Sequence, residues 1–313
     1  MEYSGLEGYM CQLSISSDPR KRLSVHPLLW TPLHLSLLSC EFANRGAVVV
    51  EGIPEPEEPP KTKDDREMLE DVERFFTARV VSPSHTRDVL EELIGGLECR
   101  SERIELRFGG RTTADLRIVS FNHAESLPQL GYINLTRTHQ DKRRALVGGP
   151  PPTRADLKPS RHRHRPVFTN MLASHRTKKL LHRLNIDDLD EDPYIAAVLI
   201  ALAQKQRHYL LRGEKASQMV LASKSCIGRC DNPRMHIYAC AMSTAFIDAL
   251  QDPNRPLPAE SPTPVGITIH HQRLPLKPYS TLAKRLQHAV RETHASLTVD
   301  NVGMDLSGPD VAV

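Results

Sequence analysis

The feature that most constrains the fold is an unbroken apolar run in the second half of the chain. Residues 195–203 (IAAVLIALA) contain no polar side chain. Asp192 and Pro193 stand before this run, an order typical of a helix start, because Asp caps free amide groups and Pro lacks a donor that the first turn would leave unpaired. A helix that is apolar on every side has to be enclosed on every side. The sequence therefore predicts a central buried helix near 193–211.

The rest of the chain mixes helical and strand patterns. Apolar residues at helical spacing predict helices at 32–43, 66–80, 84–98, 169–184, 243–250 and 279–291. Alternating or β-branched apolar runs predict strands at 47–50, 104–108, 116–121, 132–135, 219–223, 235–241 and 265–270. These elements predict an α+β fold, with a mixed or antiparallel sheet packed with helices.

Composition divides the chain into a folded region and loose ends. We expect residues 1–25 to be a disordered N-terminus, 26–291 to form one α+β domain, and 292–313 to be a loose C-terminal tail. The segment 137–166 is basic and rich in Pro and Gly, which favours an exposed linker. An alternative organisation therefore has two lobes, joined by this linker, at 26–136 and 167–291.

Global charge and cysteine usage indicate where such a chain resides. The formal net charge is +3, from 41 basic and 38 acidic residues, so overall charge predicts neither a nucleic-acid binder nor a membrane-surface protein. We find no export signal, and six scattered Cys in a long chain fit reduced thiols. We expect a soluble protein of the cytoplasm or nucleus without a membrane partner.

The strongest local charge feature is the basic stretch 154–183. Clustered cations favour phosphate binding, because they release counterions from a nucleic acid. Phe168 is the only Phe, Tyr or Trp in the stretch, so base stacking would be limited. A solvated loop or a nuclear-import signal fits equally well. The candidate nucleic-acid-binding residues are Arg161, Arg163, Arg165, Arg176, Lys178 and Lys179.

Four further residues have the chemistry of zinc ligands, namely Cys226, Cys230, His236 and Cys240. Thiolates and imidazole are the ligands that zinc prefers. However, the spacing differs from that of a zinc knuckle at every interval, and His236 and Cys240 fall in a predicted strand. The alternative is a hairpin that happens to contain thiols, so no cofactor is predicted and zinc is kept as a possibility to test.

A metal-dependent nuclease would need an acid on one strand and a Glu-x-Lys on the next. Glu105 and Asp115 flank a predicted hairpin and are well placed to start such a site, but no Glu-x-Lys follows on a strand. The chain also lacks a Gly-x-Ser-x-Gly elbow, a phosphate-binding Gly-rich loop and a dinucleotide fingerprint. The sequence thus favours a protein that is not an enzyme, with a degenerate nuclease as an alternative.

Two segments carry a resemblance to a known group. Residues 26–52 (HPLLWTPLHLSLLSCEFANRGAVVVEG) and 190–210 (DEDPYIAAVLIALAQKQRHYL) resemble uncharacterised proteins of filamentous fungi, in which Asp-Pro-Tyr opens an Ala/Leu-rich helix. The resemblance implies a fungal, lineage-limited protein and transfers no activity, cofactor or site residue.

Together these observations predict a non-catalytic accessory or interaction protein of fungal type that binds an unknown protein partner. The alternatives are a nucleic-acid-associated protein that uses 154–183 and a zinc-containing protein.

Overall fold

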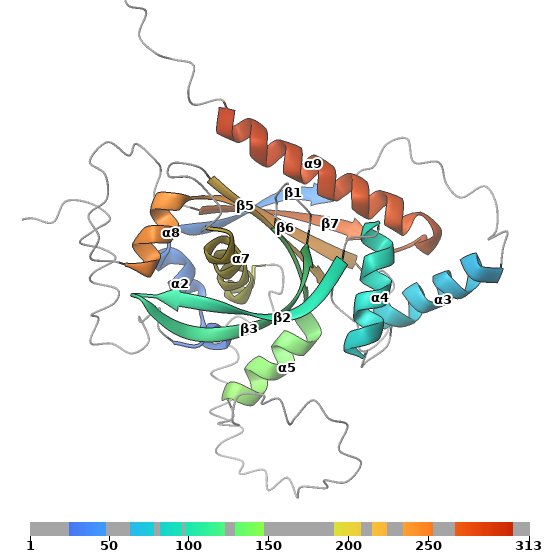
Figure 1. The fold of residues 1–313 in the computed structure, drawn as a ribbon, viewed down its shortest axis with the longest axis horizontal. Coiled ribbons are helices and arrows are strands. Elements are labelled where there is room, and N and C mark those ends of the chain that lie inside the picture. Colours follow the sequence, from blue (N-terminus) through green and yellow to red (C-terminus); the bar gives the residue numbers. More distant parts are fainter. Residues whose placement is uncertain are drawn as a thin grey trace, which may run out of the picture.

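A computed structural model describes residues 25–47, 63–77, 82–95, 98–122, 129–146, 191–207, 215–223, 234–252 and 267–302. Within these residues, seven strands form one mixed sheet in the order β1-β7-β6-β5-β4-β3-β2 (Figure 1). The strands are β1 (Cys40–Ala47), β2 (Glu98–Phe108), β3 (Arg111–Asn122), β4 (Gln129–Asn134), β5 (Lys215–Ser223), β6 (Arg234–Ser243) and β7 (Ile267–Pro275). The predicted α+β class is confirmed.

The sheet joins strands from both halves of the sequence. β1 pairs in parallel with β7, and β4 pairs in parallel with β5, whereas the other neighbours are antiparallel. The two lobes considered above therefore share one sheet rather than having a sheet each.

The helical elements lie on both faces of this sheet. They are η2 (Pro27–Leu29), α2 (Pro32–Leu37), α3 (Lys63–Thr77), α4 (Pro83–Ile94), α5 (Leu135–Leu146), α7 (Pro193–Gln206), α8 (Thr244–Gln251), η5 (Tyr279–Thr281) and α9 (Leu282–Val302). None of the described helices is both long enough and apolar enough to cross a membrane.

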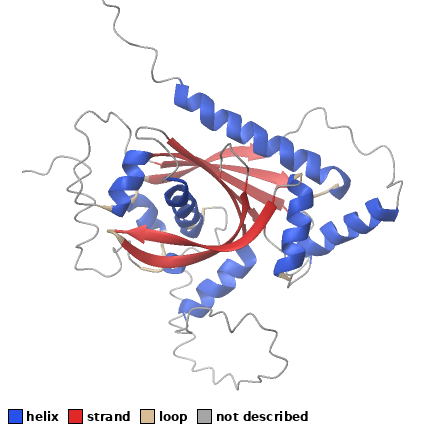
Figure 2. Ribbon diagram, in the orientation of Figure 1, coloured by secondary structure: helices blue, strands red, loops and turns tan. Residues whose placement is uncertain are grey.

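Helix α7 is the enclosed rod that the apolar run predicts. Every residue of 193–204 is buried, and the side chains from Ile195 to Ala203 are at most 1% exposed. Figure 2 shows the helix inside the curve of the sheet, and residues of η2, α2 and α8 belong to the same hydrophobic cluster. The prediction of a central buried helix is confirmed, and within the described residues the helix ends at Gln206.

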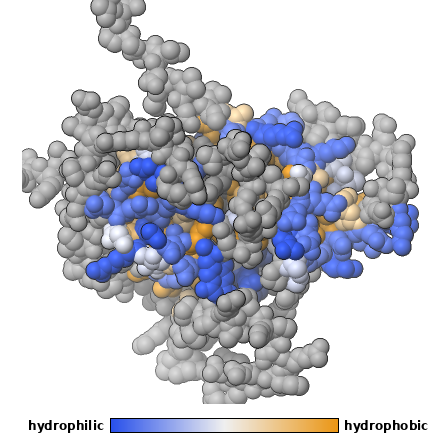
Figure 3. Space-filling view, viewed as in Figure 1, coloured by the Kyte–Doolittle hydropathy of each residue, from blue (hydrophilic) through white to orange (hydrophobic). Residues whose placement is uncertain are grey.

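The sheet separates two hydrophobic clusters, because neighbouring residues of a strand point to opposite faces. On β6, Tyr238 and Cys240 pack with α7, whereas Ile237 and Ala239 pack with α4 and α9. The sheet is thus the middle layer of the molecule. On the face that Figure 3 shows, the surface over α3 and α4 is mostly hydrophilic.

The predicted helix at 32–43 is wrong in its second half. Helix α2 ends at Leu37, Ser39 adopts a positive φ of 49°, and β1 begins at Cys40. Pairing of β1 with β7 outweighs the local helical pattern, and no local signal in the sequence reports that distant partner. The strand predicted at 47–50 starts too late, since Ala47 already ends β1, and 48–50 lies outside the described residues.

Two predicted loose segments are partly helical. Residues 137–146 belong to α5, so the predicted linker is wrong there, and 147–166 lies outside the described residues. Helix α9 extends to Val302, so the predicted tail is wrong for 292–302, where Thr293 and Leu297 are buried. The predicted N-terminus at 1–24 and helix at 169–184 also lie outside the described residues.

Candidate functional site

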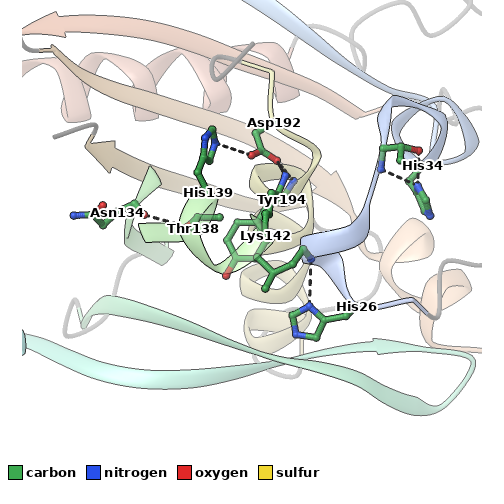
Figure 4. Close-up of polar contacts among 10 residues, drawn as sticks. His26, His34, Asn134, Thr138, His139, Lys142, Asp192 and Tyr194 are labelled. Carbon is green, nitrogen blue, oxygen red and sulfur yellow. Dashed lines mark hydrogen bonds and ion pairs between the residues drawn. The ribbon is translucent and has the colours of Figure 1, made fainter. Parts of the chain in front are cut away.

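Polar and charged side chains gather where the parallel strands β4 and β5 end. In this region β4 leads directly into α5, and α7 begins nearby (Figure 4). Asn134 ends β4, and its side-chain oxygen accepts a hydrogen bond from the Arg137 amide at 3.0 Å, which caps the first turn of α5. The carboxyl ends of parallel strands are a common place for ligand sites, which makes this cluster a candidate functional site.

Asp192 lies at the centre of the cluster as the N-cap of α7. Its carboxylate accepts the Tyr194 amide at 2.8 Å, and its side chain is 5% exposed. The capping role predicted from the Asp-Pro order is confirmed.

Helix α5 supplies two cationic or titratable partners to this carboxylate. The Lys142 ammonium donates to one oxygen of Asp192, and the His139 Nε2 lies 3.2 Å from the other. The two side chains lie on one face of α5 because they are three residues apart. The Lys142 side chain is 3% exposed and the His139 side chain is 14% exposed, so their contacts with Asp192 are largely shielded from solvent.

The surroundings set the protonation of these groups. Burial by itself would raise the pKa of Asp192, but the Lys142 charge, the hydrogen bonds from His139 and Lys142 and the Tyr194 amide together lower it to about 2. Burial raises the pKa of the Tyr194 hydroxyl. Asp192 is therefore an anion at neutral pH and Tyr194 is neutral.

This arrangement is suited to holding two helices together. A carboxylate beside an imidazole can also orient a general base, but catalysis then requires a nucleophile or substrate group at the second ring nitrogen. No hydrogen bond to that nitrogen of His139 is found within the described part of the chain. The oxygens of Asp192 take donors from α5 and from α7, so the carboxylate joins the two helices.

The opposite side of α5 carries positive charge. Arg137 is exposed, and the Arg144 side chain is 65% exposed, with its guanidinium 3.6 Å from Asp141. Burial raises the pKa of Asp141, and Arg137, Arg144 and Arg117 oppose that rise. We call Arg137 and Arg144 the α5 basic face.

The other histidines in Figure 4 have local structural roles. His26 accepts the Leu28 amide at 3.2 Å and closes η2, and His34 accepts the Thr31 amide at 3.0 Å at the start of α2. Trp30, which is fully buried, stacks on His34 with ring centroids 5.7 Å apart.

A second buried polar cluster lies on β6 and β7. His236 Nδ1 and His271 Nε2 are 3.0 Å apart, and the ring planes differ by 12° with centroids 5.2 Å apart. That centroid distance is close to the nitrogen distance plus both ring radii, so the rings lie end to end in nearly one plane. One imidazole therefore donates to the other. Tyr238 stacks on His271 with centroids 4.6 Å apart.

The geometry of β6 does not bring His236 and Cys240, two of the four candidate zinc ligands, to one metal ion. His236 and Cys240 lie on one regular strand and are about 13 Å apart along it, whereas zinc needs both ligand atoms within about 2.3 Å. Burial raises the pKa of the Cys240 thiol, which disfavours the thiolate that zinc requires. Cys226 and Cys230 lie outside the described residues, within which no group of three or more His, Cys, Asp or Glu could hold a metal.

The two acids considered for a nuclease are cross-strand neighbours. Glu105 on β2 is directly opposite Asp115 on β3, and both are exposed. Glu105 is bound by Arg107 at 2.9 Å and by Thr112 at 3.1 Å. The strand next to β3 is β4 (QLGYIN), which contains neither Glu nor Lys. An intact nuclease site of this type is therefore not built on this sheet.

The remaining predicted site residues cannot be placed. Arg161, Arg163, Arg165, Arg176, Lys178 and Lys179 all lie outside the described residues. Sequence reasoning missed Lys142, His139 and the partner of His236. Lys142 sits in a segment without apolar periodicity, and only the three-residue spacing from His139 hinted at a shared helical face.

The comparisons with known proteins add no relative. No family model matches the chain, and no curated protein or solved structure matches it.

Proposed function

We propose that this chain is a non-catalytic accessory or interaction protein, and that its α5 basic face contacts an acidic surface of a protein partner. The observation that carries the proposal is the tie between Asp192 and α5. Three donors from two helices converge on one buried carboxylate, which fixes α5 on the core while Arg137 and Arg144 point to solvent. Helices held in this way present a preorganised surface, which lowers the entropy cost of binding.

A cytoplasmic or nuclear location and a filamentous-fungal origin are parts of this proposal. The resemblance in 26–52 and 190–210 supports the origin, and the reduced-thiol composition supports the location.

The proposal is tested by co-purification from cells in which the tagged full chain is expressed. Three proteins are compared: the wild type, a double variant of the α5 basic face, and a control that removes two exposed cations from α9. The double variant is Arg137→Glu/Arg144→Glu and the control is Lys284→Glu/Arg291→Glu. We expect a partner that is retained by the control and lost by the α5 variant.

Two results would contradict the proposal. One is a set of partners that is the same for all three proteins. The other is turnover of a substrate by the purified chain that disappears in His139→Ala while the protein stays folded, since His139 would then be a catalytic group.

A nucleic-acid partner is the second candidate, because the chain continues from α5 towards the basic stretch 154–183. Clustered Arg and Lys neutralise phosphates, so binding should weaken steeply with salt. Fluorescence anisotropy with labelled single-stranded and duplex DNA at low salt measures this directly.

The decisive variant is Arg161→Glu/Arg163→Glu/Arg165→Glu, with the α9 variant as the control for net charge. We expect the slope of log affinity against log salt to fall by about 2 to 3 in the triple variant. Wild-type protein that binds neither DNA at low salt would end this alternative.

A further inference from the structure

The last strand of the sheet, β2, has one edge without a neighbouring strand in the described part of the chain. It spans eleven residues, which is long for an edge strand, since most proteins keep such edges short or interrupt them. It contains neither Pro nor a bulge, because the register shift near Leu106 leaves its extra residue, Thr113, on β3. The strand is therefore a regular template for pairing.

The direction of its free backbone groups follows from one contact. The Gln204 carboxamide of α7 accepts the Arg107 amide at 2.9 Å and donates to the Arg107 carbonyl at 2.8 Å. Gln204 thereby takes the place of a neighbouring strand at Arg107, so both main-chain groups of Arg107 point away from β3. Alternate residues of a strand point their main-chain groups the same way. The amides and carbonyls of Arg103 and Glu105 therefore also point to the open edge.

Side chains next to this edge carry alternating charge. Arg103 and Glu105 are exposed on the outer face of the sheet, whereas Ile104 between them is 3% exposed and packs in the α7 cluster. The order of charges along β2 is positive at Arg103, negative at Glu105 and positive at Arg107, and the Glu105 carboxylate, which Arg107 of the same chain contacts, remains exposed. Arg103 and Glu105 lie at equal distances on either side of Ile104 and carry opposite charges. Two copies of this segment that run antiparallel and are centred on Ile104 therefore place opposite charges next to each other.

We propose that β2 pairs in antiparallel fashion with β2 of a second copy of this chain, about a two-fold axis at Ile104. Arg103 of each copy then lies opposite Glu105 of the other, and the two sheets become continuous. Opposite charges that face each other across strands stabilise a pair, and like charges destabilise it.

The same charges select the register. Sliding the strands by two residues, which keeps the side-chain faces matched, brings Arg103 opposite Arg103 of the second copy and is disfavoured. Since Gln204 occupies the edge at Arg107, the paired segment is short and includes Arg103 and Glu105 as the hydrogen-bonding residues. We therefore expect a weak dimer that forms at high protein concentration.

The test uses sedimentation velocity of the full chain across a wide range of concentration. The wild type should shift from monomer to dimer. Arg103→Glu and Glu105→Arg should each weaken self-association by about tenfold or more, because each change places like charges opposite one another twice.

Two combinations should restore the dimer. The double variant Arg103→Glu/Glu105→Arg inverts the pattern and keeps it self-complementary. An equimolar mixture of the two single variants should form a mixed dimer, since every cross-strand pair is then of opposite charge. Arg111→Glu, an exposed change of the same size at the tip of the hairpin, serves as the control and should leave the dimer unchanged.

Three outcomes would overturn the proposal. They are a wild type that stays monomeric at all concentrations, a dimer that the single variants do not weaken, and a dimer that neither combination restores. Equal urea stability of the Arg103→Glu variant and the wild type excludes misfolding as the cause of a loss. The proposal is independent of the α5 basic face, so either can fail alone.

Discussion

Replacing Asp192 with Asn separates the two roles of this side chain, which caps α7 and also carries the negative charge that faces Lys142. Asn caps helices about as well as Asp does, so the cap of α7 is retained and the charge facing Lys142 is removed. Breaking a buried ion pair by removing one partner costs about 3 to 5 kcal/mol, because the other charge is left buried. The shift of the Asp192 pKa from 3.8 to about 2 corresponds to about 2 kcal/mol. We expect Asp192→Asn to lose about 3 kcal/mol of unfolding free energy at pH 7.

Urea unfolding of the full chain measures this loss. A second variant, Asp192→Asn/Lys142→Met, removes both charges and should recover most of it, because a neutral pair of similar volume is tolerated in a core. Asp88→Asn serves as the control, since Asp88 is an exposed partner of Arg87 and should change the free energy by less than about 0.5 kcal/mol. If Asp192→Asn unfolds within about 0.5 kcal/mol of the wild type, the reasoning that α5 is held by this charge is wrong.

The pH dependence of the unfolding free energy gives an independent check, because the lowered pKa of Asp192 fixes the direction of the change. A carboxylate whose pKa is lowered by folding contributes its full stabilisation at pH values above its pKa in the unfolded chain. That stabilisation is lost as the pH falls through its pKa in the folded protein. For Asp192 this window runs from 3.8 down to about 2. The difference in unfolding free energy between the wild type and Asp192→Asn should therefore be constant from neutral pH to about pH 5 and shrink below it.

Three further substitutions test other contacts, each by urea unfolding. His271→Ala removes the hydrogen-bond partner of the buried His236 and should lower the free energy of unfolding by about 1 to 3 kcal/mol. An unchanged free energy would contradict a hydrogen bond between the two rings. Gln204→Leu should cost a similar amount and should speed hydrogen exchange of the Arg107 amide, whereas unchanged exchange would contradict the strand-like contact. Gly131→Ala should cost about 1 to 3 kcal/mol, because the added carbon would lie 3.2 Å from a leucine of α7, and a neutral effect would show that the helix can shift.

Features governed by local chemistry were predictable from the sequence. The Asp-Pro start of α7 and its uniform apolar character gave both the position of the helix and its burial. The α8 helix followed from its apolar periodicity, and the β2–β3 hairpin from the two neighbouring strand patterns at 104–108 and 116–121. In these segments the local preference and the final structure agree.

Features that depend on distant partners were not predictable. The start of β1 at Cys40 depends on pairing with β7. In α5, Lys142 is paired with Asp192, which comes fifty residues later in the chain. A buried Lys has the same sequence signature as a solvated one, so the sequence predicts a linker at residues 137–146, where α5 forms. The hydrogen bond between His236 and His271 likewise exists only once β6 and β7 are adjacent.

The pairing of β1 with β7 sets a condition on synthesis of the protein. Glu41 of β1 and its partner Thr268 of β7 are separated by 227 residues. At about 5 to 20 residues per second, a ribosome needs about 10 to 45 seconds to make the intervening chain. During that time the nascent β1 segment has no β7 to pair with, so this edge of the sheet is completed only after residue 275 has been made, and a stop before residue 267 would leave the strand permanently exposed to chaperones and proteases.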